Sequence, residues 1–315
     1  MAVAVVGAGR MGSVHLEALA SAENARLAAV VEPVAVDRAA RWGVPVVASI
    51  EELAAEGLAE AVVIAAPTDL HRRLVEQSAA AGLHVFCEKP VGVSLEEAAG
   101  ATAAAATAGV VLQVGYYRRF VPSLVALRSR MARGEFGTVE LLALHQWDEH
   151  PPGPEFEAHS GGIVIDMGVH EIDQLRWMTG REVDDVSAVA ADDGSAAAIA
   201  LRLGPTLGVI TLGRRFPEPD SCWMEVVGEL AYERVPFIWG ADGARETRAA
   251  VVAEHAAFAT AVRGAPMTGA TGGDAVAALE AAGRINALLA DQCASRAQPP
   301  PSPSGSHSHG PRPAR

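Results

Sequence analysis

Short apolar runs alternate with alanine-rich, helix-compatible stretches along the first 115 or so residues. This strand–helix alternation predicts an α/β domain in which helices cover both faces of a parallel sheet. The expected strands are Val3–Val6, Leu27–Val31, Ala61–Ala65, His84–Cys87 and Val110–Val114. The expected helices between them are Met11–Ser21, Pro33–Trp42, Asp69–Ala81 and Leu95–Ala108.

The pattern changes after about Phe120 and predicts a second domain. A helix at Pro122–Arg133 leads into longer strand-like runs, several of which follow one another without a helix, so the second sheet is expected to be mostly antiparallel. The expected strands are Val139–Gln146, Val183–Ala191, Ala197–Leu203, Leu207–Leu212 and Cys222–Val227. The expected helices are Asp166–Thr179, ended by Gly180, and Ala249–Arg263 and Gly273–Leu289.

The last segment is rich in proline and serine and cannot bury enough apolar surface to offset the entropy of ordering it. We therefore divide the chain into a dinucleotide-binding domain at 1–119, a substrate-binding and oligomerisation domain at 120–291, and a disordered tail at 292–315.

Charge and cysteine content narrow the classes of function. The formal net charge of -13 argues against a nucleic acid or an anionic membrane as partner, because both favour a basic surface. The three cysteines lack metal-ligand or disulfide spacing, so reduced thiols and no metal site are expected. No signal peptide or apolar span long enough to cross a membrane is visible, which predicts a cytoplasmic protein.

A glycine-rich turn directly follows the first expected strand and precedes the first helix. Its residues are Gly7, Ala8, Gly9, Arg10, Met11 and Gly12, which match G-x-G-x-x-G. Such glycines allow a tight turn and close approach of a pyrophosphate, which the helix N-terminus then binds. Glu32 closes the second strand, where a carboxylate accepts hydrogen bonds from the adenosine ribose and repels a 2′-phosphate. The sequence therefore predicts NAD as cofactor in preference to NADP.

The loop after the third strand supplies further cofactor candidates, Pro67, Thr68 and His71. The loop is expected at the carboxyl edge of the sheet, where ligands bind in doubly wound folds. Thr68 or Asp69 also suits the N-cap of the following helix.

Lys89 is the only lysine among the 25 lysine and arginine residues of the chain. It stands in the motif Glu88-Lys89-Pro90, just after an expected strand. An ammonium group, unlike a guanidinium group, can share its proton in catalysis. Retention of one lysine at this position predicts a catalytic role.

A second catalytic motif runs from Gly161 to Asp173. If this segment is helical, Asp166, His170 and Asp173 project from one stripe. A carboxylate one turn from an imidazole can orient the ring and raise its basicity, as a general base requires.

These motifs, in this order, resemble the Gfo/Idh/MocA oxidoreductase family, which includes inositol 2-dehydrogenases. The resemblance rests on the three segments above and on Gln113–Phe120, and it covers about 290 residues. It implies an NAD(P)-binding Rossmann domain and a polyol or sugar bound over the open face of a second α/β domain. By resemblance, Lys89 hydrogen-bonds the reacting hydroxyl, His170 removes its proton, and Asp166 holds His170.

The resemblance also assigns binding residues. Glu88 is assigned to the cofactor, and Lys89, His170, Arg118, Asp148 and Asp173 are assigned to the substrate. The stretch Trp147–Pro152 is most similar to the inositol dehydrogenase branch, but Trp147 replaces that branch's usual arginine and Val121 replaces its aspartate. Myo-inositol, another cyclitol, an aminocyclitol and a sugar therefore all stay open as substrates.

These motifs are consistent with three hypotheses about the function. The first is an NAD-dependent dehydrogenase of a cyclic polyol, and the second is an NAD(P)H-dependent ketosugar or aminocyclitol reductase. The third is a nucleotide-sensing regulator without catalysis, which intact Lys89, Asp166 and His170 disfavour. A mostly antiparallel sheet with one uncovered face predicts a homo-oligomer, either a dimer or a tetramer.

Overall fold

The computed structural model describes residues 1–22, 24–239 and 242–297. Within these ranges, one sheet has seven strands in the order β13-β6-β5-β4-β1-β2-β3, and all pairs are parallel except β13 with β6. The strands are β1 (Ala2–Val6), β2 (Arg26–Val31), β3 (Val46–Val47), β4 (Ala61–Ile64), β5 (His84–Glu88), β6 (Leu112–Gly115) and β13 (Ala270–Thr271). The predicted parallel sheet is confirmed, and the carboxyl ends of its parallel strands share one edge.

Helices α1 (Arg10–Ala20), α2 (Val36–Ala40), α3 (Ile50–Ala55), α4 (His71–Ala80) and α5 (Leu95–Ala108) connect these strands. A 3-10 turn, η1 (Thr68–Leu70), precedes α4. The expected helix Pro33–Trp42 is shorter in the structure, and α3 and β3 were not predicted. The signal for α3 is local, because the Ser49 side chain accepts a hydrogen bond from the Glu52 N–H and caps the helix.

The second sheet has the order β12-β11-β7-β10-β9-β8 within the described residues. Only β10 and β7 pair in parallel, so the expected mostly antiparallel sheet is confirmed. Its strands are β7 (Val139–Trp147), β8 (Asp185–Ala190), β9 (Ala196–Leu203), β10 (Thr206–Gly213), β11 (Ser221–Gly228) and β12 (Tyr232–Pro236).

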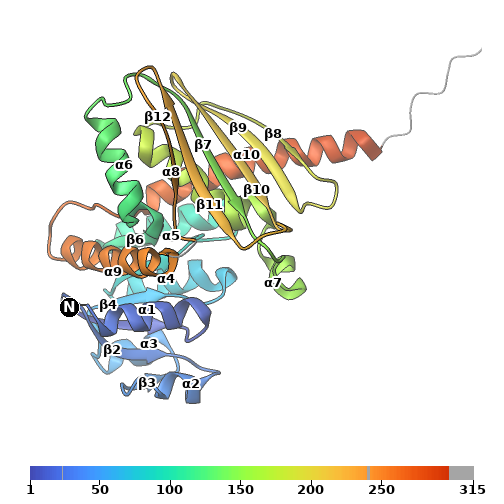
Figure 1. Ribbon diagram of the computed structural model, residues 1–315. Coiled ribbons are helices and arrows are strands. Elements are labelled where there is room, and N and C mark those ends of the chain that lie inside the picture. Colours follow the sequence, from blue (N-terminus) through green and yellow to red (C-terminus); the bar gives the residue numbers. More distant parts are fainter. Residues whose placement is uncertain (23, 240–241, 298–315) are drawn as a thin grey trace, which may run out of the picture.

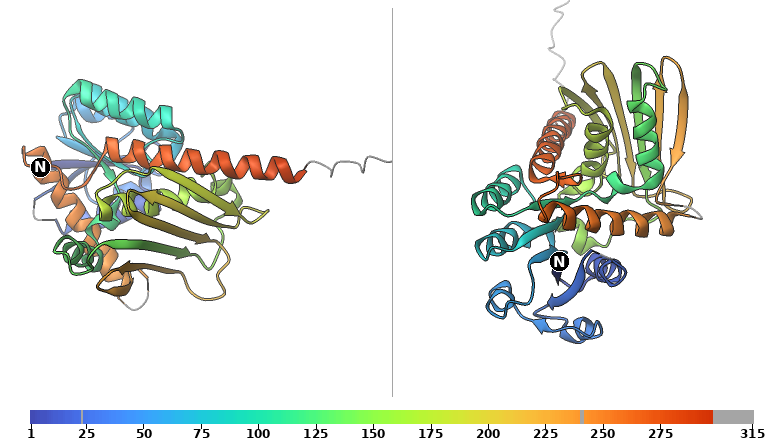
Figure 2. Two further views of the ribbon diagram at one scale, coloured as in Figure 1. Left: turned by 90° about the horizontal axis from the view of Figure 1, so that it is seen from above. Right: turned by 90° about the vertical axis from the view of Figure 1, so that its left-hand side faces the viewer.

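The remaining helices come after β6 in the chain. They are η2 (Tyr117–Phe120), α6 (Pro122–Ala132), α7 (Pro154–His159), α8 (Val169–Thr179), α9 (Gly243–Val262) and α10 (Gly272–Ala297). Helix α8 packs on β10 and α10 packs on β8. Figures 1 and 2 show α8 and α10 behind the sheet, whereas none of the labelled helices covers its other face.

A π-helical turn, η3 (Val164–Gly168), replaces the first part of the helix expected at Asp166–Thr179. The expected end of that helix is confirmed, because Gly180 adopts the left-handed conformation with φ 65°. The π turn changes which side chains share a face, and this change matters for the site.

The C-terminal segment returns to the N-terminal half. Helix α9 packs on α1 and on η2, and β13 adds an antiparallel edge strand to the first sheet (Figure 1). Helix α10 continues to Ala297, so residues 292–297 are helical where a disordered tail was expected. The rest of the expected tail, 298–315, lies outside the described residues.

Candidate active site

The glycine-rich turn has the geometry that a dinucleotide requires. Gly7 has φ +95°, and a Cβ there would lie 2.8 Å from the Ala65 oxygen. A Cβ on Gly12 would lie 2.0 Å from the Gly7 oxygen, so strand and helix approach closely only because both residues are glycine. A Cβ on Gly9 would meet open space, and α1 begins immediately after it with Arg10 exposed. The turn therefore leaves room for a pyrophosphate at the N-terminus of α1.

Glu32 directly follows β2, and its side chain lies beside the glycine-rich turn. Its Oε2 accepts a hydrogen bond from the Ala8 N–H at 2.8 Å, and its Oε1 accepts from the N–H groups of Val34 and Ala35 at 3.1 and 3.0 Å. Partial burial raises the pKa of Glu32, but these N–H groups more than offset it and the pKa is lowered. A fixed, ionised carboxylate thus lies beside the glycine-rich turn.

The loop after β4 separates the remaining cofactor candidates into two kinds. Pro67 is exposed and Thr68 half-buried, at the same sheet edge as Gly7. His71, by contrast, is buried, and its ring nitrogens lie 2.8 Å from the Pro90 oxygen and 2.9 Å from the Ala66 oxygen. His71 therefore bridges the loop after β4 and the loop after β5. Because both of its ring nitrogens face main-chain oxygens, its geometry suits a structural role better than a contact with the cofactor.

Lys89 follows β5 and reaches across to the π turn. Its Nζ donates a hydrogen bond to the main-chain oxygen of Asp166 at 2.6 Å and lies 3.6 Å from Oδ1 of the same residue. Asp166 Oδ2 accepts a hydrogen bond at 2.8 Å from Arg214, which follows β10 and is only 2% exposed. One carboxylate is therefore held by a cation from each half of the molecule.

His170 lies one turn after Asp166 and is 8% exposed. The rings of Tyr116 and Tyr117 meet it edge-on, with centroids 5.8 and 5.9 Å away. Burial lowers the pKa of His170 well below its usual value, and the charges of Lys89 and Arg118 lower it further. Within the described part of the chain, its Nδ1 has no hydrogen-bond partner. The lowered pKa keeps the ring neutral at neutral pH.

Asp166 was expected to contact His170, but its carboxylate contacts other residues in the structure. The carboxylate of Asp166 contacts Lys89 and Arg214, and the π turn shifts it relative to the α-helical register that the spacing assumed. The structure brings Lys89, Asp166 and His170 together, but it links Asp166 to the lysine.

Arg118 lies at the base of the site and is 3% exposed. Its guanidinium donates hydrogen bonds to Glu171, to Gln174 and to Gln146, and Gln146 in turn donates to Asp148 Oδ1 at 3.2 Å. The pKa of Asp148 is raised because the residue is partly buried and lies near other carboxylates. Asp148 is half-buried at the end of β7 and can still meet a ligand, whereas Arg118 is held within the protein.

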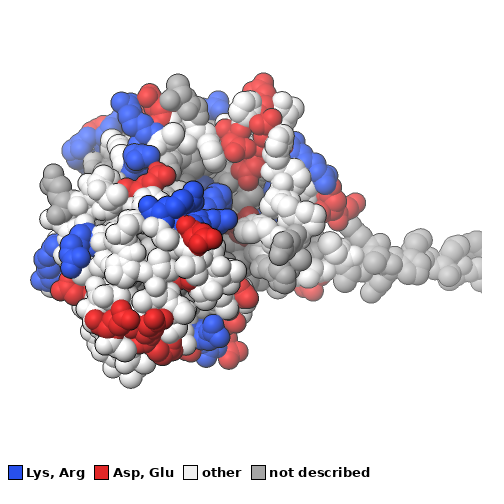
Figure 3. All heavy atoms as spheres, turned by 90° about the horizontal axis from the view of Figure 1, so that it is seen from below, with Lys and Arg blue, Asp and Glu red and all other residues white. Residues whose placement is uncertain are grey.

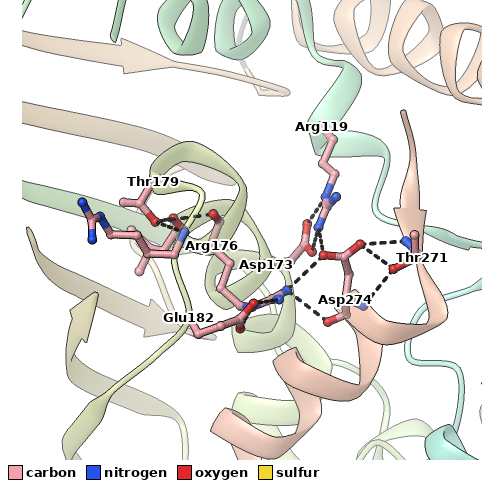
Figure 4. Close-up of polar contacts among 9 residues, drawn as sticks. Arg119, Asp173, Arg176, Thr179, Glu182, Thr271 and Asp274 are labelled. Atoms are coloured by element: carbon pink, nitrogen blue, oxygen red, sulfur yellow. Dashed lines mark hydrogen bonds and ion pairs between the residues drawn. The ribbon is translucent and has the colours of Figure 1, made fainter. Parts of the chain in front are cut away.

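Asp173 does not join the site. It is fully buried, and its two carboxylate oxygens accept hydrogen bonds from Arg119 at 2.9 and 2.6 Å. Figure 4 shows this pair continuing to Asp274, which also contacts Arg176. The network joins η2, α8 and α10. Asp173 therefore belongs to an ion-pair network between helices and does not line a substrate surface, contrary to expectation.

Three buried residues in or near the site were not foreseen, namely Arg214, His15 and His255. The sequence offers one weak signal for Arg214, an arginine pair directly after an apolar strand. His15 and His255 are 240 positions apart, and their contact depends on the return of α9 to the first half.

The described residues contain no cluster of three or more His, Cys, Asp or Glu side chains able to hold a metal ion. No helix in the described part of the chain is long and apolar enough to cross a membrane. Figure 3 shows basic side chains in separate groups beside acidic ones on the face of the molecule seen from below.

Comparisons with known proteins identify both halves of the chain. Residues 1–116 match the model described as "Oxidoreductase family, NAD-binding Rossmann fold", and residues 124–232 match the GFO/IDH/MocA C-terminal domain. The chain is 40% identical over 297 residues to the rhizopine catabolism protein MocA of Rhizobium meliloti, covering 90% of this chain and 94% of that protein.

Two further similarities concern inositol dehydrogenases. The chain is 35% identical over 243 residues to the myo-inositol dehydrogenase Hyg17 of Streptomyces leeuwenhoekii, covering 73% and 74% of the two chains. The crystal structure of scyllo-inositol dehydrogenase from Lactobacillus casei, with bound NAD(H) and scyllo-inositol, superposes with a TM-score of 0.84. It is 25% identical, and the superposition covers 93% of this chain and 97% of that one.

Proposed function

The chain belongs to the Gfo/Idh/MocA family and is an oxidoreductase that acts on CH–OH groups, and from this premise we propose that it oxidises a secondary hydroxyl of a cyclic polyol to a ketone with NAD. The observation that carries the proposal is the arrangement of Lys89 and His170. A lysine ammonium paired with Asp166 stands beside a buried neutral imidazole, next to the cofactor edge of the first sheet.

In the proposed reaction the substrate hydroxyl lies between these two groups. Lys89 donates a hydrogen bond to the hydroxyl oxygen, and His170 accepts the hydroxyl proton as general base. NAD, when bound, would supply the acceptor for the hydride from the same carbon, so that the alcohol would lose two electrons and become a ketone. Asp166, held by Arg214, keeps the Lys89 ammonium in place throughout.

The cofactor residues support NAD. Gly7, Gly9 and Gly12 form the cradle for the pyrophosphate, and Glu32 offers a fixed carboxylate to the adenosine ribose. Arg10, Met11, Pro67, Thr68 and Glu88 remain proposed contacts along the same edge. We assign no cofactor contact to His71, because both of its ring nitrogens already face main-chain oxygens.

The substrate side of the site supports a polyhydroxylated ring. Asp148, at the end of β7, offers a carboxylate to further hydroxyl groups. Trp147 closes this end of the sheet, and its ring packs where a Cβ on Gly213 would lie. The inositol dehydrogenases among the similar proteins act on substrates of this class.

The open face of the second sheet supports a homo-oligomer. His145 and Trp223 stack there with ring centroids 4.6 Å apart, and Arg234 covers the same indole. Leu207 is 46% and Tyr232 62% exposed. A broad, mostly uncharged face of this kind is buried best by a second copy of the chain, and we propose that it forms the subunit interface.

The test is absorbance at 340 nm with NAD or NADP against myo-inositol, scyllo-inositol, an aminocyclitol and several aldoses. NADH formation with a cyclitol is the expected result. Reduction of NADP alone would overturn the role of Glu32 and spare the catalytic residues. No reaction with any alcohol, despite measurable NAD binding, would instead favour a reductase of an untested ketone.

A further inference from the structure

A buried chain of hydrogen bonds joins three parts of the molecule behind the site. His15 Nε2 lies 2.7 Å from Glu88 Oε1, and His15 Nδ1 lies 2.9 Å from His255 Nε2. His15 comes from α1, Glu88 from the end of β5, and His255 from α9, far along the chain. Both histidines are at most 1% exposed, so water does not compete for these bonds.

The apolar surroundings keep this chain of hydrogen bonds rigid. Phe86 meets the His15 ring at 5.4 Å and the His255 ring at 5.1 Å, and Phe258 packs against Phe86 at 5.9 Å. On the other side, Gly115 leaves space for Glu88, because a Cβ there would lie 3.0 Å from the carboxyl carbon. The positions of the carboxylate and of both rings are therefore fixed.

The charge of Glu88 sets the direction of the hydrogen bond between Glu88 and His15. Burial raises the pKa of Glu88, but the hydrogen bond from His15 and nearby positive charges more than offset this and the pKa is lowered. The ionised Glu88 accepts a hydrogen bond from His15 Nε2–H. The other nitrogen of His15, Nδ1, has His255 Nε2 as its hydrogen-bond partner. Without His255, that nitrogen would be buried without a partner.

The chain ends at the proposed catalytic lysine. Glu88 Oε2 accepts a hydrogen bond from the Lys89 main-chain N–H at 3.2 Å, and Glu88 directly precedes Lys89. His15, in the middle of these hydrogen bonds, is on the helix whose N-terminus forms the cofactor cradle. A displacement of His255 would thus reach both Lys89 and α1.

We propose that His255 is a positioning residue, which acts through His15 and Glu88 to hold Lys89 and the cofactor-binding helix in register. This inference rests on the proposed function, because it requires Lys89 to act in catalysis. It predicts that α9, which touches neither cofactor nor substrate in the proposal, contributes to turnover through one hydrogen bond.

Three variants test the proposal. His255→Leu removes the hydrogen bond and keeps an apolar side chain, and His255→Gln restores a donor at the place of Nε2. Phe258→Leu is the matched control, because it loosens the same apolar cluster without removing a polar contact. Melting temperatures, NAD dissociation constants by calorimetry, and kcat and KM for the best polyol are measured for all three.

The expected result is a fall of about tenfold in kcat for His255→Leu, consistent with loss of one buried hydrogen bond. KM for the polyol should stay within about twofold, and NAD should bind several-fold more weakly. His255→Gln should recover most of both losses, and Phe258→Leu should lower the melting temperature with kcat unchanged. Equal effects of His255→Leu and Phe258→Leu, or no recovery with glutamine, would overturn the proposal.

The two proposals fail in different ways. If the unsubstituted protein binds NAD but oxidises no polyol, the proposed function fails. In that case, the NAD affinities of the His255 variants are the measurement that tests the positioning role. A loss with leucine that glutamine restores supports that role, and equal affinity in all variants refutes it.

Discussion

The ammonium of Lys89 contacts Asp166 twice, through the main-chain oxygen at 2.6 Å and through Oδ1 at 3.6 Å. The first contact is made to a carbonyl group within a π turn, and such turns occur often at functional sites. The only lysine of the chain is thereby tied to the helix that carries His170.

Replacing Lys89 tests this arrangement most directly. Lys89→Ala should lower kcat by about a thousandfold or more, because the hydrogen bond to the reacting oxygen is lost. NAD binding should change little. Lys89→Arg is the control, since it keeps the charge but cannot share its proton in the same way. Steady-state rates at 340 nm and NAD titration give both answers, and an alanine variant within tenfold of the unsubstituted rate would contradict the assignment.

The pH dependence of the reaction should report His170. Its pKa is lowered well below 6.5 in the folded protein, so the ring stays unprotonated and active as pH falls through 6.5. We expect kcat/KM to decline only at a lower pH, where the buried ring finally gains a proton. Profiles from pH 4.5 to 8 provide the measurement. An acid limb centred at 6.5 or above would show that another group, or an exposed His170, controls the rate.

Cofactor preference should depend on Glu32. Glu32→Ala removes the negative charge near the ribose, so NADP should bind more tightly relative to NAD, by about tenfold or more in the ratio of dissociation constants. The variant also loses the acceptor for the Ala8 N–H, and both affinities should fall somewhat. Glu32→Gln separates these effects, because it keeps an acceptor without the charge. An unchanged ratio in both variants would remove Glu32 from cofactor selection.

Glu254 gives a prediction about stability. It is 1% exposed, neither carboxyl oxygen has a hydrogen-bond partner among the described residues, and burial with the nearby Glu88 and Asp173 raises its pKa well above 4.5. The folded state therefore retains a proton that the unfolded chain releases above pH 4.5. Stability should decline from that pH upward, until the folded carboxyl also loses its proton.

Glu254→Gln removes this decline because the amide is uncharged. The variant should melt about 2 °C or more above the unsubstituted protein at pH 8, and the difference should shrink toward pH 4.5. Glu280→Gln, at an exposed position on α10, is the control and should show no such trend. Parallel pH dependence of Glu254→Gln and the unsubstituted protein would mean that Glu254 is ionised in the fold.

The assembly can be tested at Trp223. Trp223→Glu places a charge on the open face, beside His145 and Arg234, and should shift the sedimentation profile toward the monomer. Val34→Glu, at a site 88% exposed in the other half, serves as the control. An identical profile for Trp223→Glu and the unsubstituted protein would place the interface elsewhere.

Local patterns in the sequence predicted much of this structure. Leu95–Ala108 was predicted with its observed bounds, because Ser94 caps its start and Gly109 ends it in the left-handed conformation. Strands β3, β12 and β13 were not predicted, but local patterns did predict the other strands of both sheets, the glycine-rich turn and Gly180. Each depends on residues within one or two turns.

The failures come from longer-range effects. Helical spacing placed Asp173 beside His170, but Arg119 binds its carboxylate in a buried ion-pair network. The contact of Arg214 with Asp166 depends on how β10 meets the π turn, and no local pattern encodes that approach. His15 and His255 meet for the same kind of reason.

Strand β13 has a consequence for how the protein is made. The cofactor half gains its last edge strand from residues 270–271, and the helices beside that strand cover α1 and α5. During synthesis, the first 119 residues therefore emerge with an uncovered sheet edge and an exposed α1, and they stay so until nearly the whole chain has been translated. Maturation of the nucleotide-binding half is accordingly a late event on the ribosome, and chains truncated before β13 should be subject to chaperone retention and proteolysis.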